Sequence, residues 1–218
     1  MKTVYLTFDD GPLGGTDDVI SVLNDRGVKG TLFMVGDKRE KGWGARVFNM
    51  ARASSFVQIA NHSYTHALID GKLQYRLYYS SPRKVVEGFE KATEALKIKC
   101  KPISARLPGR NTWSIKGVER FDGDSGSTAK ILRNRGYNIY GWDIEWYMKK
   151  GVPVETVDEM IEKVKKGFSD KKTEKEDKII ILMHDIMFRA SKGNKKNLEA
   201  FIDGLKKEKY EFCFIRDY

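Results

Sequence analysis

The chain has 218 residues but only two cysteines, and it has no long hydrophobic run. Two cysteines, Cys100 and Cys213, are too few for a disulfide framework in a chain of this length. Neither has a second Cys or a His at zinc-finger spacing, so we expect buried free thiols. A single disulfide between them is the alternative if the protein is exported. No apolar stretch is long enough to cross a bilayer, so we predict no membrane span.

The N-terminal residues, MKTVYLTFDDGP, lack the apolar stretch and the small-residue cleavage site of a secretory signal. They are typical of a strand that runs into a loop. The sequence therefore predicts a cytoplasmic protein or, if a signal has been removed, one that is secreted, periplasmic or associated with the cell wall. We expect a monomer.

The chain has an excess of positive charge, with 40 Lys and Arg against 30 Asp and Glu and a formal net charge of +10. The density is highest near Lys163 to Lys178 and Lys192 to Lys209. This pattern favours association with anionic surfaces, but it is equally typical of a solvated, soluble surface. No nucleic-acid-binding motif is present, so we predict no nucleic-acid partner.

Short β-rich runs alternate with helical patterns along the chain, which predicts parallel strands joined by helical crossovers. We predict an α/β fold with one domain over residues 1–218, a distorted (β/α) barrel with about seven parallel strands. An open doubly wound sheet is the alternative. The predicted strands are Val4–Phe8, Thr31–Val35, Phe56–Ala60, Ser104–Leu107, Asn138–Asp143, Ile179–Met183 and Phe212–Ile215. The predicted helices are Asp17–Arg26, Ala45–Ala53, Pro82–Leu96, Ser127–Arg135, Val154–Phe168 and Asn194–Lys207.

The three histidines follow predicted strands. His62 and His66 lie four residues apart in NHSYTH, and on a helical turn that spacing would put both imidazoles on one side, where they can share a metal. His184 ends the aliphatic run IIILMH. Two surface histidines and a capping histidine are the structural alternatives. In α/β folds, however, functional groups collect at the C-terminal ends of strands.

Three further motifs also follow strands. TFDDGP places Asp9 and Asp10 together, and two adjacent carboxylates repel unless a cation or an Arg offsets their charge. ARLPGRN supplies Arg106 and a tight Pro-Gly turn that can expose a backbone N–H. GWDIEW supplies two carboxylates and two indoles. Together the five motifs predict an active site, and Asp10, His62 and His66 match a catalytic zinc with an open position.

The ordered set TFDDGP, HSYTH, RLPG, WDIEW and LMHD resembles the five motifs of the polysaccharide deacetylase family, the NodB-homology group or carbohydrate esterase family 4. The motifs extend from Thr7 to Asp185. The resemblance implies a distorted (β/α) barrel that removes acetyl groups from N-acetylated amino sugars. It also implies one divalent metal, most commonly Zn²⁺, held by Asp10, His62 and His66.

The resemblance implies roles for other residues as well. Asp9 would be the general base towards the attacking water, and Arg106 would hold Asp9 ionised and oriented. The backbone N–H of Gly109 would stabilise the oxyanion together with the metal. His184 would protonate the leaving amine as general acid, and Leu182 would line the pocket for the acetyl methyl group.

The motif GWDIEW departs from the family pattern, in which an Asp-Trp pair tunes the acid histidine. Here Glu145-Trp146 stands in that place, with Asp143 two residues earlier. Strand alternation puts both carboxylates on one face, so either could pair with His184. Trp146 or Trp142 would form a groove wall against a sugar ring, or pack in the core.

Peptidoglycan, chitin oligomers and related polymers are the substrates that the family suggests. A basic enzyme suits an anionic cell-wall polymer better than neutral chitin. One alternative is a non-catalytic glycan-binding module on the same fold, which the absence of Asp9 or His184 would favour, and both are present. Another is a nucleic-acid binder with structural histidines. The stretch Ala67 to Ser80 would form part of a glycan groove or a packed surface loop.

Overall fold

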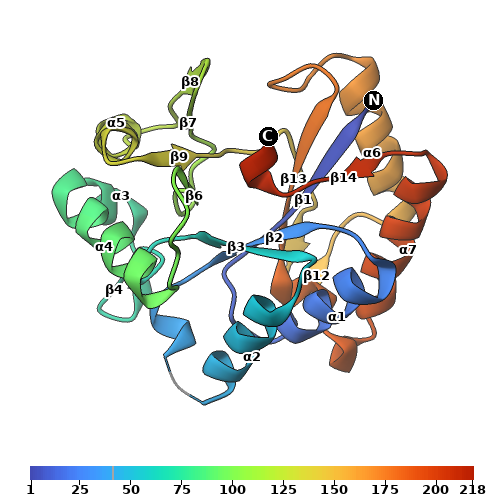
Figure 1. Ribbon diagram of the computed structural model, residues 1–218, viewed down its shortest axis with the longest axis horizontal. Helices are drawn as coiled ribbons and strands as arrows, with labels where there is room; N and C mark the ends of the chain where they lie inside the picture. Colours follow the sequence, from blue (N-terminus) through green and yellow to red (C-terminus); the bar gives the residue numbers. More distant parts are fainter. Residues whose placement is uncertain (41) are drawn as a thin grey trace. The chain divides into compact units, whose positions relative to one another are not determined.

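The computed structural model describes residues 1–40 and 42–218, which divide into two compact units. The first unit comprises Met1–Leu32, Arg46–Gln58 and Trp142–Tyr218, and the second comprises Phe33–Ala45 and Ile59–Gly141. Figure 1 traces the elements from the blue N-terminus to the red C-terminus. Within the described residues, no helix has the length and apolar character that a membrane span needs. The prediction of a single domain over residues 1–218 stays a prediction.

The first unit contains the central strands of the sheet and four of the longer helices in whole or in part. Its strands are β1 (Thr3–Asp9), β2 (Gly30–Met34), β3 (Val57–Asn61), β10 (Ile144–Glu145), β11 (Met148–Lys149), β12 (Val152–Pro153), β13 (Lys178–His184) and β14 (Glu211–Phe212), where β2 and β3 continue into the second unit. Its helices are α1 (Thr16–Arg26), α2 (Gly42–Ala53), α6 (Val157–Ser169) and α7 (Lys195–Lys207).

The strand β1 lies between β13 and β2, and β10 follows on the outer side of β13. Both β10 and β1 run parallel to β13, and β14 also pairs in parallel with β1. The pairing of β1 with β13 starts at Thr3↔Lys178 and ends at Asp9↔His184. Every residue of β1 is buried, as is the aliphatic run of β13. This buried strand pair therefore brings the last residues of both strands to the same level.

The helices of the first unit begin and end where local chemistry dictates. α1 ends at Gly27, whose left-handed conformation (φ 60°) lets the chain turn away. α6 begins with a capping box, in which Thr156 and Glu159 satisfy each other's backbone N–H groups. α7 packs against α1 and α6. Its buried residues have the spacing of an amphipathic helix: Leu198, Phe201, Ile202 and Leu205.

In the second unit the strand order is β3, β6, β9, β7, β8. The pairings of β6 with β3 and with β9 are parallel, whereas β7 pairs antiparallel with β9 and β8. α4 and α5 pack on each other over a core that includes Phe89, Leu107 and Leu132. The elements are β4 (Leu68–Ile69), β5 (Lys72–Leu73), α3 (Tyr75–Tyr79), α4 (Pro82–Ala95), β6 (Ile103–Ala105), β7 (Trp113–Ile115), β8 (Val118–Arg120), α5 (Gly126–Asn134) and β9 (Tyr137–Ile139).

Within the described residues, six of the seven predicted strands and all six predicted helices are present, with differences at their ends. Of the predicted strand Phe212–Ile215, only Phe212 lies in β14, and Ile215 begins a short 3-10 helix. The predicted strand Asn138–Asp143 is shorter, because β9 ends at Ile139 and β10 begins only at Ile144. The hairpins β4–β5, β7–β8 and β11–β12 were not predicted, since strands of two or three residues carry no periodic signal. Both cysteines are free, but Cys100 is exposed, so the prediction that it is buried is wrong.

Candidate active site

His62 follows β3 directly and is fixed by two backbone groups. Its N–H donates to the Met34 carbonyl at 2.9 Å. Its Nδ1 lies 2.9 Å from the carbonyl oxygen of Arg106, and the ring is 2 % exposed. Because a carbonyl oxygen only accepts, Nδ1 must carry the proton, and the lone pair is left on Nε2. A histidine that binds a metal through one nitrogen usually donates the other to such a group, so His62 fits a metal ligand.

His66 lies on a turn, and the prediction of a helical turn between the two histidines is wrong. Ser63, His66 and Ala67 have positive φ angles of 67°, 52° and 56°, which no α-helix allows. The N–H of His66 donates to Ser63 Oγ at 3.0 Å. The two imidazole centroids nevertheless lie 4.8 Å apart. The two rings are therefore brought together by a turn with positive φ angles, and not by the expected helical turn.

Asn61 anchors this turn, although the sequence gave no reason to select it. Its side chain is fully buried. Its Nδ2 donates to the Phe89 carbonyl at 2.8 Å and to Thr93 Oγ1 at 2.9 Å. Its Oδ1 accepts from the Ser63 N–H at 2.8 Å. The only local signal is an Asn immediately before the histidine motif, where an Asx turn is common.

Asp10 follows β1 with a φ of 77°, so its backbone turns sharply after the strand. Each of Asp10, His62 and His66 offers one ligand atom, and these atoms all lie within 4.8 Å of one another. One carboxylate and two imidazoles form the donor set of many catalytic zinc sites. The three residues selected from the sequence therefore satisfy the requirement of proximity that a shared cation imposes.

Asp9 and His184 are the paired last residues of β1 and β13. Asp9 is 4 % exposed. The parallel register thus gives one carboxylate and one imidazole at the same end of two neighbouring strands. The backbone after each strand takes a different path. Asp10 leaves β1 in a turn, whereas Asp185 starts a short 3-10 helix, Asp185–Phe188.

Glu145 interacts electrostatically with His184, whereas the Asp143 carboxylate is engaged by backbone amides. Burial raises the pKa of the Glu145 carboxyl, while the charges of His184 and Lys163 lower it. The carboxylate of Asp143 instead accepts from the backbone N–H groups of Glu174 and Ile180, each at 2.7 Å. Since the chain between β9 and β10 is not a strand, the alternation expected for the two acids does not apply. The pairing of Glu145 with His184 stays a prediction.

Trp146 is a core residue and does not present its ring to a sugar. It is fully buried, and its ring centroid lies 4.9 Å from that of Phe201 and 5.4 Å from that of Phe188. Its Nε1–H donates to the Glu155 carbonyl at 2.9 Å. The predicted groove wall is therefore wrong for Trp146, and the core-packing alternative holds. Leu182 is 4 % exposed on β13, and its place in an acetyl pocket stays a prediction.

Arg106 is fully buried and held by backbone carbonyls of the second unit. Its Nε donates to Tyr140 at 3.2 Å and its Nη2 to Gly141 at 2.8 Å. The guanidinium lies over the ring of Phe33, 4.2 Å from the centroid. A buried cation held this rigidly is costly unless it serves a partner. The predicted role of orienting Asp9 stays a prediction.

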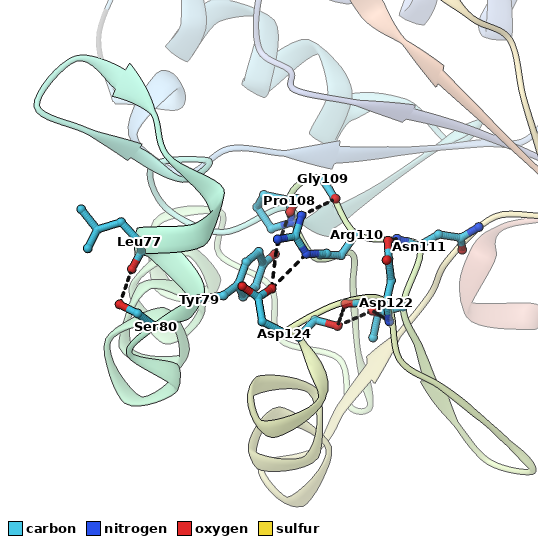
Figure 2. A network of polar contacts seen from close by, with 11 residues as sticks. Leu77, Tyr79, Ser80, Pro108, Gly109, Arg110, Asn111, Asp122 and Asp124 are labelled. Carbon is cyan, nitrogen blue, oxygen red and sulfur yellow. Dashed lines mark hydrogen bonds and ion pairs between the residues drawn. The ribbon is translucent and has the colours of Figure 1, made fainter.

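The loop around Gly109 is braced from two sides (Figure 2). Gly109 has a φ of 62°, and a Cβ there would lie 2.7 Å from the Tyr75 ring. Tyr79 donates its hydroxyl to the Pro108 carbonyl at 2.7 Å. Arg110 donates from Nε and Nη2 to Asp124 at 3.1 and 2.9 Å. These contacts fix the direction of the backbone at Gly109, the predicted oxyanion donor.

Asp185 is a further residue that the sequence did not select for a role. It is fully buried, and it accepts a 2.5 Å hydrogen bond from Thr16 Oγ1. Thr16 Oγ1 in turn accepts from the Leu13 N–H at 2.9 Å. A Cβ at Gly11 would collide with the same carboxylate. The residue after His184 therefore ties down the loop that follows Asp10.

With one carboxylate and two imidazoles at strand ends, and with an Asp and a His paired across two strands, the site is of the hydrolase type. The family model described as polysaccharide deacetylase matches residues 1–110, half of the chain. The chain therefore belongs to the polysaccharide deacetylase family.

Several known proteins are similar to the chain. A chitin disaccharide deacetylase of Vibrio alginolyticus is 26% identical over 204 residues, which cover 66% of this chain and 47% of that protein. A peptidoglycan-N-acetylglucosamine deacetylase of Bacillus cereus is 26% identical over 225 residues, covering 97% of this chain and 68% of that protein. The chain thus spans about half the length of the Vibrio protein.

Solved structures show the same fold. The catalytic domain of a peptidoglycan N-acetylglucosamine deacetylase from Eubacterium rectale has a TM-score of 0.70 and 20% identity, over 98% of this chain and 88% of that chain. A family 4 carbohydrate esterase from Streptomyces lividans has a TM-score of 0.64 and 20% identity, over 98% of this chain and 93% of that chain. The predicted α/β fold of the distorted-barrel type is confirmed.

Proposed function

We propose that this chain is a metal-dependent hydrolase that removes N-acetyl groups from amino sugars of a polysaccharide. Water cleaves the acetamide C–N bond, and the products are acetate and a free amine on the sugar. The observation that carries the proposal is the proximity of ligand atoms from Asp10, His62 and His66 within 4.8 Å. We also propose that residues 1–218 act as a single catalytic domain.

The donor set fits a divalent cation, and we propose Zn²⁺. The Arg106 carbonyl accepts a hydrogen bond from the Nδ1–H of His62, so Nε2 carries the lone pair that would bind the metal. A bound Zn²⁺ would polarise the acetamide carbonyl and lower the pKa of water towards about 7. We assign the proton transfers to side chains of the protein.

Asp9 is suited to accept the proton of the attacking water, because it is a buried carboxylate at the end of β1. His184 is suited to donate a proton to the leaving nitrogen, since it lies opposite Asp9 on β13. Glu145 interacts electrostatically with His184, and we propose that it orients this imidazole. The N–H of Gly109 would donate to the developing oxyanion, and Leu182 would contact the acetyl methyl group.

Acetate release from N-acetylated oligosaccharides tests the proposal. Chitin oligomers and peptidoglycan fragments should release acetate, a chelator should stop the release, and added Zn²⁺ should restore it. Asp9→Asn should lose at least about 100-fold in rate with its metal content unchanged. Asp25→Asn, an exposed position on α1, is the matched control. Glycan binding without acetate release would instead favour a non-catalytic glycan-binding module.

A further inference from the structure

The chain returns to the histidine turn after the short β4–β5 hairpin. The two ends of this hairpin are joined by a hydrogen bond from the Gln74 N–H to the Ala67 carbonyl at 3.1 Å. The side chain of Gln74 also donates to the Ile69 carbonyl, at 3.0 Å. Because the hairpin closes on itself, the next residue, Tyr75, begins α3 beside His66, although the whole hairpin separates the two along the chain.

The half-buried ring of Tyr75 contacts two groups of the candidate active site. It meets the His66 imidazole edge to face, with centroids 6.1 Å apart and an angle of 82°, which is a preferred geometry of aromatic pairs. Its ring carbons also lie against Gly109, where a Cβ would come within 2.7 Å of them. One ring is thus shared by a proposed metal ligand and by the residue whose N–H is the proposed oxyanion donor.

The helix α3 is also fixed to the loop that carries Gly109. The Tyr79 hydroxyl donates to the Pro108 carbonyl at 2.7 Å (Figure 2). The guanidinium of Arg110 lies 5.7 Å from the ring centroid of Tyr75 and 4.9 Å from that of Tyr79, within the range of cation–π contacts. All of these residues belong to the second unit. Their contacts restrict the movement of the Tyr75 ring relative to the loop.

We propose that Tyr75 is a positioning residue that couples the orientation of the His66 imidazole to that of the Gly109 backbone. Its ring fills the space that a side chain at position 109 would need, so a displacement of the ring changes both groups together. The ring carbons make both contacts, and the coupling therefore does not require the hydroxyl. This inference rests on the proposed function for the roles of His66 and Gly109.

The first test compares Tyr75→Leu with Tyr75→Phe. Tyr75→Leu removes both ring contacts and should weaken Zn²⁺ affinity about tenfold, in the range for groups that orient a metal ligand. It should also lower kcat about tenfold, a part of what one oxyanion donor contributes. Tyr75→Phe keeps the ring and should behave as the parent chain in both measurements.

The matched control is Phe121→Leu. Phe121 is a partly buried ring that packs on the same core as Tyr75, and it contacts Lys130 and the Cα side of Gly126. Both leucine variants should lose similar stability in denaturant unfolding. Only Tyr75→Leu should lose Zn²⁺ affinity and kcat, which separates a positioning role from a loss of packing.

A double-mutant cycle with Gly109→Ala tests the coupling itself. The new Cβ would push against the Tyr75 ring, so Gly109→Ala should weaken Zn²⁺ affinity although Gly109 is not a proposed ligand. In the Tyr75→Leu background the Cβ meets no ring, and the same substitution should leave the affinity unchanged. The strain of an alanine at the positive φ of position 109 is common to both backgrounds and cancels in the cycle.

Two readouts that need no turnover separate this inference from the proposed function. One is Zn²⁺ titration, and the other is the imidazole C–H proton resonances of His66 in the metal-free chain, which Gly109→Ala should shift only when Tyr75 is present. If acetate release fails but these couplings are found, the positioning role stands without the reaction. Additive effects in the cycle, or equal Zn²⁺ affinities in Tyr75→Leu and Phe121→Leu, would overturn the positioning role, while acetate release by the parent chain leaves the function intact.

Discussion

The two units hold their candidate active-site groups by different means. In the second unit, His62 and Arg106 are fixed by hydrogen bonds to backbone carbonyls, and both are buried. In the first unit, Asp9 and His184 are placed by strand register, and His184 interacts with the charge of Glu145. The comparison indicates that substitutions in the second unit should disturb geometry and folding, whereas substitutions in the first should disturb protonation.

The largest expected effect contrasts His62→Ala with His184→Ala. Both should lower acetate release by at least about 100-fold, but for different reasons. His62→Ala should weaken metal binding by more than about 100-fold, which is the upper range for residues that only support a ligand. His184→Ala should keep its metal and lose about 10²–10⁴ in rate as a missing general acid. Elemental analysis after dialysis checks the contrast, and equal metal content in both variants would refute the ligand assignment.

The next prediction concerns Asn61, whose buried side chain makes three hydrogen bonds. Asn61→Ala should lower the unfolding free energy by about 2–3 kcal/mol, because buried partners lose their bonds. It should also weaken metal affinity about tenfold, since the turn that positions His66 is released. Denaturant unfolding and metal titration measure the two effects. The control is Asn197→Ala, at a half-buried position on α7. An unaltered metal affinity in Asn61→Ala would show that the turn held by Asn61 does not affect metal binding.

The sequence predicted what depends on local pattern. Strand ends at Asp9, His62 and His184 follow from apolar runs that stop at polar residues, and the order of motifs supplied the proposed ligand set. The supporting residues escaped prediction because their partners are distant along the chain. Asn61 bonds a carbonyl 28 residues away, and Asp185 accepts from a hydroxyl 169 residues away. No periodicity encodes such pairs, so only tertiary structure reveals them.

Glu145→Gln should alter the pH dependence of stability above pH 4.5. Burial raises the pKa of Glu145 above its ordinary value of 4.5. The folded protein therefore keeps this proton at a pH where the unfolded chain has lost it, and stability falls as pH rises through 4.5 towards the folded value. Glu145→Gln removes that decline. Asp143→Asn should instead destabilise through its two amide partners.

The two substitutions, Glu145→Gln and Asp143→Asn, should also differ in their effects on activity. The Glu145 carboxyl interacts electrostatically with His184, Lys163, Asp9 and Glu155, so its removal alters the charge around the proposed acid. We expect Glu145→Gln to lower kcat about tenfold at neutral pH and to move the alkaline limb of the rate profile to lower pH. Asp143→Asn should leave the position of that limb unchanged. A limb that moves in Asp143→Asn but not in Glu145→Gln would reverse the assignment of the partner.

The smallest effect tests whether a single buried hydrogen bond in the second unit acts on catalysis or only on folding. Tyr79→Phe removes the bond to the Pro108 carbonyl, next to Gly109. Tyr5→Phe, in the first unit, removes one bond, from its hydroxyl to the Asp217 carbonyl at 3.3 Å. Each should lower the unfolding free energy by about 1 kcal/mol. Only Tyr79→Phe should also lower kcat, by about three- to tenfold, a fraction of the ~10²–10³ that one oxyanion donor contributes. Because the two variants match in stability, a difference in kcat isolates the orientation of Gly109, and equal kcat values would mean that the loop keeps its geometry through Tyr75 and Arg110 alone.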